Sequence, residues 1–176
     1  AKETVVGWDS LLTEVRTEYD LMLRPVKRIE LAHGGPARNS AFYTYGDNAA
    51  PFASHNQCGR VVRIDDSAGS ILFSSYALTG GVASQTRYFL ETLDEPHWPV
   101  AEAERDLLHE PGSGAITRTA FNAIGNTLCV EDAKGNVQFS DLNVAGQLSS
   151  VRLQQAGDSN AAPLLHGIQY SAGNQI

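Results

Sequence analysis

The stretch from Gly59 to Val82 reads GRVVRIDDSAGSILFSSYALTGGV, and the stretch from Gly125 to Leu148 reads GNTLCVEDAKGNVQFSDLNVAGQL. Glycines lie at positions 59, 69 and 80 in the first stretch and at 125, 135 and 146 in the second, so their spacing is the same in both. In each copy an aspartate precedes the second glycine and a Phe-Ser pair follows it. Self-similarity of this kind is typical of repeated supersecondary units. The sequence therefore predicts a repeat protein.

The glycines close turns between short apolar runs. An Asp or Asn side chain accepts a backbone N–H two residues on, and glycine takes the positive φ that closes a hairpin. Runs rich in Val, Ile, Leu, Phe and Thr between these turns predict strands. A turn about every ten residues predicts an all-β fold, an antiparallel meander. The predicted structural turn residues are Asp66, Gly69, Gly80, Asn122, Gly125, Asp132, Gly135, Asn143 and Gly146.

The repeat is weaker or interrupted in three places. After Asp20, Leu23 stands where a turn glycine would be expected. Residues 49–56 are predicted to be an irregular loop, and residues 91–114 an insertion rich in proline and acids. Within the insertion, Pro99 suits a first helical turn and a Pro-Gly pair ends the segment, so we expect one short helix near residues 100–109. We expect a single domain of residues 1–176.

Composition excludes several classes of protein. The net charge of -7 argues against nucleic-acid binding. Cys58 and Cys129 are too few and too far apart for a disulfide scaffold or a structural zinc site, and we expect both thiols to be inert and partly buried. There is no run of 18 apolar residues and no leader, which predicts neither a membrane span nor a signal peptide. We interpret the chain as a fragment of a longer one.

Catalytic patterns are few. Gly112-Ser113-Gly114 is too short for a nucleophile elbow and predicts a turn. Asp65 and Asp66 resemble a paired acid and base, but neighbouring strand residues point to opposite faces, and Asp66 aligns with the turn residue Asp132, so we expect structural roles.

We predict no metal and no cofactor. The five histidines lack metal-ligand spacing, and the glycines lack a phosphate-binding pattern. His109 lies near the C-terminus of the expected helix, where a favourable interaction with the helix dipole offers a structural explanation for it. The histidines are His33, His55, His97, His109 and His166.

Aromatic residues leave one alternative open, a small carbohydrate-binding or adhesion module. Their rings could form a sugar platform, although aromatics on strands more often pack across strands. A closed barrel with Tyr43, Tyr45 or Trp98 in a groove would favour that alternative. The residues are Trp8, Phe42, Tyr43, Tyr45 and Trp98.

A family resemblance rests on particular motifs. Tyr19-Asp20 with Arg24-Pro25, the spaced glycines and the segment 58–69 resemble the YD-repeat or Rhs family. More closely, residues from about 15 to 176 resemble the N-terminal part of the C subunit of bacterial Tc insecticidal toxin complexes. Further similarity lies in Leu78-Thr79-Gly80, Glu95-Pro96-His97-Trp98, Asp132-Ala133-Lys134-Gly135-Asn136 and Val144-Ala145-Gly146-Gln147-Leu148.

The resemblance implies a wall-building role without catalysis. In that family such strands wind into a hollow shell that is built jointly with a B subunit. The shell encloses a variable C-terminal toxic domain until an A subunit delivers it. The implied partners are the rest of the C subunit and a B-type subunit, within a secreted complex. The family's self-cleaving aspartyl protease motif has no match here. We also expect exposed edge strands to favour self-association.

Overall fold

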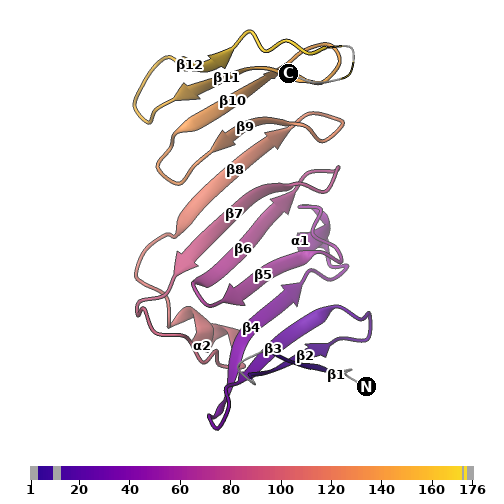
Figure 1. Ribbon diagram of the computed structural model, residues 1–176, viewed down its shortest axis with the longest axis vertical. Coiled ribbons are helices and arrows are strands. Elements are labelled where there is room, and N and C mark those ends of the chain that lie inside the picture. Colours follow the sequence, from indigo (N-terminus) through magenta and orange to yellow (C-terminus); the bar gives the residue numbers. More distant parts are fainter. Residues whose placement is uncertain (1–3, 10–12, 172, 174–176) are drawn as a thin grey trace. The chain divides into compact units, whose positions relative to one another are not determined.

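The computed structural model describes residues 4–9, 13–171 and 173. These residues form twelve antiparallel strands in an open sheet whose strand order is the chain order (Figure 1), which confirms the predicted all-β meander. The strands are β1 (Thr4–Trp8), β2 (Glu14–Tyr19), β3 (Pro25–Leu31), β4 (Ala37–Tyr45), β5 (Val61–Asp66), β6 (Gly69–Tyr76), β7 (Val82–Phe89), β8 (Ala115–Phe121), β9 (Thr127–Glu131), β10 (Val137–Leu142), β11 (Leu148–Gln154) and β12 (Ala162–His166).

Two short helices lie in the connections, α1 (Ala50–Ala53) and α2 (Glu102–Asp106). Helix α2 confirms the predicted helix, although it begins after Pro99 and ends before His109. Helix α1 corrects the expected irregular loop at 49–56, since a single helical turn is too short to show apolar periodicity. No helix in the described part of the chain is long and apolar enough to cross a bilayer.

The chain divides into two compact units. The first consists of Ala1–Phe73 and Arg87–Gly114, and the second of Ser74–Thr86 and Ala115–Ile176. Strands β1 to β5 and both helices belong to the first unit, and β8 to β12 belong to the second, while β6 and β7 contribute residues to each. The single domain of residues 1–176 stays a prediction.

A five-residue turn recurs between strands. In the β9–β10 turn the Asp132 N–H donates to the Asn136 carbonyl at 2.9 Å, and the Gly135 N–H donates to the Asp132 carbonyl at 3.0 Å. The Asp132 carboxylate accepts the N–H groups of Lys134 and Asn136 at 2.8 and 2.9 Å. Hydrogen bonds from the Asn136 side chain and backbone lower the pKa of Asp132. The same pattern recurs at 122–126 and 143–147, with Asn122 and Asn143 in the aspartate's place.

Two further turns keep this backbone with other residues. At 77–81 the Gly80 N–H donates to the Ala77 carbonyl at 2.9 Å. Ala77 occupies the position that Asp or Asn occupies in the other turns, so no Asx side chain takes part. At 20–24 the Leu23 N–H donates to the Asp20 carbonyl at 3.0 Å. Leu23 adopts a φ of 58°, the left-handed conformation that Gly135 adopts at 84°. The backbone of this turn therefore forms without its glycine.

Gly69 lies in a different kind of turn. Asp66 pairs directly with Gly69, so the chain reverses at Ser67 and Ala68, and Gly69 is the first residue of β6. The Asp66 carboxylate accepts the Ala68 N–H at 2.8 Å. A Cβ on Gly69 would lie 2.0 Å from the carbonyl oxygen of Tyr88. Close approach of the backbone, in addition to a φ of 126°, therefore requires glycine here.

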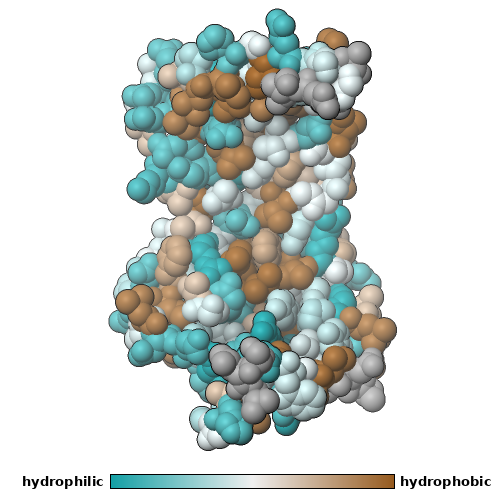
Figure 2. All heavy atoms as spheres, viewed as in Figure 1, coloured by the Kyte–Doolittle hydropathy of each residue, from teal (hydrophilic) through white to brown (hydrophobic). Residues whose placement is uncertain are grey.

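The described residues bury few apolar side chains. Only Ala41, Pro96 and Trp98 are buried among them, whereas the buried polar and charged residues include Arg63, Asp65 and Arg105. Figure 2 shows hydrophobic and hydrophilic side chains interleaved on the visible face. Stability therefore depends on strand pairing, turns and polar contacts more than on an apolar core.

We predict that Leu23→Gly stabilises the protein, by about 0.5–1 kcal/mol. A left-handed backbone costs a non-glycine residue about 1–2 kcal/mol, part of which the greater flexibility of glycine in the unfolded chain offsets. Urea unfolding measures the change. The control is Leu21→Gly, which lies in the same turn without a positive φ and should be neutral or destabilising. Equal effects of the two substitutions would contradict the assignment of strain to Leu23.

Candidate functional site

A buried charged cluster joins the 91–114 connection to the strands of the first unit. We call Arg63, Asp65, Ser70 and Arg105 the Asp65 cluster. Arg63 and Asp65 lie two residues apart on β5 and therefore share one face of the strand. Ser70 lies directly opposite Asp65 on β6. Arg105 comes from α2, which lies next to β4 and β5 in Figure 1.

The Asp65 carboxylate lies between two guanidinium groups. Its Oδ1 is 2.7 Å from Arg63 Nε, and its Oδ2 is 3.0 Å from Arg105 Nε. The contact with Arg105 is an ion pair without an aligned hydrogen bond, since neither atom has a hydrogen-bond partner. Asp65 is 0% exposed and both arginines are 4% exposed. These charges therefore attract one another with little screening by water.

His109 completes the contact between the connection and β6. Ser70 donates its hydroxyl proton to Asp65 Oδ1, and the Nε2 of His109 lies 2.7 Å from the same hydroxyl oxygen. Because that proton is already donated, His109 must donate from Nε2. The imidazole also stacks on Tyr88 of β7, with ring centroids 5.4 Å apart. The sequence suggested the helix dipole as the reason for a histidine at position 109, but the main contacts of His109 are with Ser70 and Tyr88.

Trp98 fixes the other end of the connection. Its indole N–H donates to the Asp66 carbonyl at 3.1 Å. Its backbone N–H donates to the Asn39 carbonyl at 3.0 Å, and the Asn39 amide donates back to the Trp98 carbonyl at 2.9 Å. Trp98 is 0% exposed. The connection is therefore bound to β4, β5 and β6 at both ends of α2.

Electrostatics favour a neutral His109. Burial, and next the positive charge of Arg63, lower the pKa of His109, while Asp106 and Asp65 oppose this shift. Asp106 itself lies 2.7 Å from Arg63 Nη1. A proton added to His109 would therefore meet a site that already holds a nearby cation.

The arrangement does not resemble a serine hydrolase site. In a catalytic triad the acid orients the histidine, whereas here Asp65 binds the serine hydroxyl directly. Ser70 is completely buried. A groove of about 450 Å³ lies beside the cluster, lined by Arg63, Leu72, Tyr88, Glu102, Asp106, His109, Glu110, Pro111 and Gly112. The geometry of the cluster supports holding the connection in place.

The predicted turn residues lie apart from this cluster, with one exception. Asp66 follows Asp65 and pairs with Arg87 at 2.6 Å, in addition to accepting the turn N–H. The other predicted residues lie in or beside the turns described above. Sequence reasoning gave Asp65 a structural role but missed its partners. A signal was available in the comparison of the two repeat copies. Arg63 of the first copy aligns with Cys129 of the second, so the arginine is not part of the common repeat pattern and indicates a contact specific to the first copy.

The aromatic residues proposed for sugar binding mostly have other contacts. Phe42 lies under the guanidinium of Arg105, and Tyr45 under that of Arg24, at 4.5 and 4.2 Å from the ring centroids. The Tyr45 hydroxyl donates to the Pro25 carbonyl at 2.9 Å. Together with the complete burial of Trp98, these contacts argue against the sugar platform that the sequence left open as an alternative.

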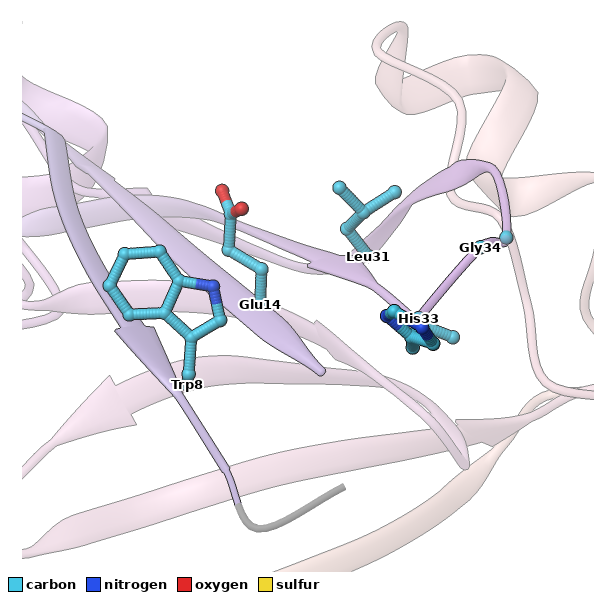
Figure 3. Close-up of a pocket in the computed structure, with 7 residues that line it drawn as sticks. Trp8, Glu14, Leu31, His33 and Gly34 are labelled. Carbon is cyan, nitrogen blue, oxygen red and sulfur yellow. The ribbon is translucent and has the colours of Figure 1, made fainter. Parts of the chain in front are cut away.

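Trp8 is largely exposed and lines a separate groove of about 560 Å³ in the first unit (Figure 3). Strand pairing places Glu14 between Trp8 and Leu31, and His33 follows on the turn after β3. A single indole beside mixed polar groups identifies no ligand.

Cysteine and metal chemistry add little to the site. Cys58 and Cys129 are both free thiols, and Cys58 is exposed, which corrects the expected partial burial for that residue. Among the described residues no group of three or more His, Cys, Asp or Glu side chains could hold a metal ion.

Comparison with known proteins finds toxin subunits. No protein-family model matches the chain. The chain is 32% identical over 158 residues to the toxin subunit YenC2 of Yersinia entomophaga, a match that covers 86% of this chain and 16% of YenC2. It matches crystal structures of TcdB2–TccC3, without and with Cdc42, at a TM-score of 0.90 and 27% identity.

A structure of the Photorhabdus luminescens Tc holotoxin pore matches at a TM-score of 0.89 and 27% identity. In these structures the match covers 97% of this chain and 8% of the solved chain. The chain therefore spans only a small part of the proteins that it resembles.

We predict that Asp65→Ala destabilises the first unit by about 3–5 kcal/mol, because it leaves two buried guanidinium groups without their carboxylate. The control is Glu131→Ala, which removes the partner of Arg118 in a more exposed pair and should change stability by less than about 1 kcal/mol. Urea unfolding followed by far-ultraviolet circular dichroism, which reports the strands of both units, measures both. Similar losses in the two variants would refute the central role of Asp65.

We predict that acidification weakens the contact of the 91–114 connection through His109. Because the folded pKa lies below the unfolded value of 6.5, the neutral ring stabilises the fold fully above pH 6.5. That contribution is lost as the pH falls from 6.5 towards the folded pKa. The free energy of unfolding at pH 7.5 and 5.5 measures the loss. The control is His109→Gln, which keeps a donor without titrating and should lose less stability; an equal loss in both proteins would exclude His109 as the source.

Proposed function

Because the chain is a TccC-like YD/Rhs-repeat segment, we propose that it forms part of the protein shell of a secreted bacterial toxin complex. In this proposal the remainder of a C subunit and a B-type subunit build the rest of the wall. The wall encloses a C-terminal cytotoxic domain. The match to YenC2, a toxin subunit, and to TccC3 solved together with TcdB2 supports this assignment.

The observation that carries the proposal is the series of similar turns between strands paired in chain order. A meander of this kind can be lengthened by adding strand pairs, since each strand pairs with its chain neighbours. The small number of buried apolar side chains fits a wall element that gains stability from neighbouring repeats. The residues on which the proposed shell-forming role depends are therefore the turn residues.

We further propose that residues 1–176 act as one repeat domain and that residues 91–114 are an insertion bound to it. Asp65 and Trp98 hold this insertion on the strands of the first unit. We assign the segment no catalytic step and no cofactor. Edge strands β1 and β12 have one described partner each and are candidate sites of self-association when further strands are missing.

The test uses the longer subunit that carries this segment, expressed together with a B-type subunit. We expect the two to copurify and the C-terminal domain to resist added protease. Asp65→Ala in this segment should lower the yield of the protected complex at least several-fold, whereas Glu131→Ala should leave it unchanged. A subunit that does not copurify, or whose C-terminal domain is digested at the rate of the free domain, would refute the proposal.

A further inference from the structure

The 91–114 connection contacts four successive strands of the first unit. In the open sheet each strand pairs with its chain neighbours, so β4 and β7 do not pair with each other. The connection nevertheless joins them, because it contacts β4 before α2, β5 from α2, and β6 and β7 after α2. The contacts are those of Trp98 with Asn39, of Arg105 with Asp65, and of His109 with Ser70 and Tyr88.

The connection is closed at its base, next to the end of β7. Leu90 and His109 form an antiparallel bridge. Beside this bridge the Glu110 N–H donates to the carbonyl of Phe89, the last residue of β7, at 3.0 Å. The connection therefore cannot move away from β7 without losing backbone hydrogen bonds.

Trp98 attaches the connection to a part of β4 that lies outside the pairing of β4 with β5. That pairing runs from Phe42 to Tyr45, and Asn39 comes before it. Instead, the Asn39 carbonyl accepts the Trp98 N–H at 3.0 Å, and the Asn39 amide donates to the Trp98 carbonyl at 2.9 Å. Because Trp98 is completely buried, water does not readily replace these bonds. The connection thus takes the place of a strand partner at this end of β4.

The second repeat copy shows equivalent strands without such a connection. Asp65 and Ser70 align with Glu131 and Asn136. Glu131 pairs with Arg118 on the neighbouring strand β8, and the Asn136 amide donates within its own turn. These aligned residues therefore make contacts between chain neighbours, whereas those of the first copy also reach the connection. The connection is an addition to the repeat.

We propose that the 91–114 connection makes the first-unit parts of β4 to β7 open as one cooperative unit, which consists of residues 37–45, 61–66, 69–73 and 87–89. In a meander whose strands contact only chain neighbours, strands can open one at a time. Here a strand that moves away breaks a contact of the connection and leaves a buried polar group without its partner, which is costly. This behaviour belongs to the first unit and does not depend on the proposed function.

Cooperation of this kind has a definite signature in hydrogen exchange. A change at one contact lowers the free energy of the shared opening, so exchange becomes faster by a similar factor in all four strands. If the strands open separately, the effect of the change falls off along the sheet. For a change on β4, the strand that distinguishes the two cases is β7, because two strands lie between them.

The experiment is peptide-resolved hydrogen–deuterium exchange on the longer subunit that carries this segment. Asn39→Ala removes the amide that binds the Trp98 carbonyl. We expect exchange of residues 87–89 to rise about ten-fold, and by a similar factor in β5 and β6, because a buried carbonyl loses its partner. The control on the same strand is Ser40→Ala, which removes a hydroxyl bonded to the Arg28 carbonyl of β3 and should change exchange at 87–89 less than about two-fold.

A milder variant tests a second contact, in case Asn39→Ala prevents folding. Trp98→Phe keeps an aromatic ring but removes the indole N–H that donates to the Asp66 carbonyl. We expect exchange to become about three-fold faster or more, both at residues 37–41 of β4 and at residues 87–89 of β7.

Two results would overturn the cooperative unit. One is faster exchange confined to residues 91–110 and β4, because the connection would then open alone. The other is an increase that falls steadily from β5 to β7, because the strands would then open separately. Either result would leave the proposed shell function standing, since the pairing of strands in chain order does not require the connection.

Discussion

The contact of Asp65 with Arg63 and Arg105 is the constraint on which the first unit depends. A carboxylate without solvent is stable only when cations and donors surround it, and this one has two guanidinium groups and a hydroxyl. One of the guanidinium groups comes from the 91–114 connection. The connection can therefore leave the strands only by exposing or breaking a buried ion pair. The Asp65 carboxylate therefore holds the connection on the strands, as an apolar core holds the elements of most globular proteins together.

The turns supply the second constraint, and they tolerate exchange of side chains better than exchange of backbone conformation. Asp132, Asn122 and Asn143 make the same hydrogen bonds, whereas Ala77 holds its turn without them. The left-handed position persists even with Leu23. What the repeat keeps between its copies is thus a backbone path, and the outward side chains are free to specialise.

Sequence patterns were sufficient for the meander because turn chemistry is local, and a glycine three residues after Asp132 needs no distant partner. The Asp65 cluster was not predictable in the same way. Arg63 and Arg105 lie on elements far apart in the chain, and their meeting at Asp65 depends on where the connection folds back. The sequence left a sugar platform of aromatic rings open for the same reason, since the arginines that cover Phe42 and Tyr45 come from other elements. Helix α1 was missed because four residues carry no period.

Strand pairing between chain neighbours also determines how such a protein can be made. A nascent chain that emerges from the ribosome can close each hairpin as soon as its second strand appears, because the partner has just been synthesised. One step must wait, since Asn39 meets Trp98 only after 59 further residues. Until then the Asp65 carboxylate is exposed to water, because its partner Arg105 has not yet been synthesised. The 91–114 connection is thus made after the strands that it holds in place.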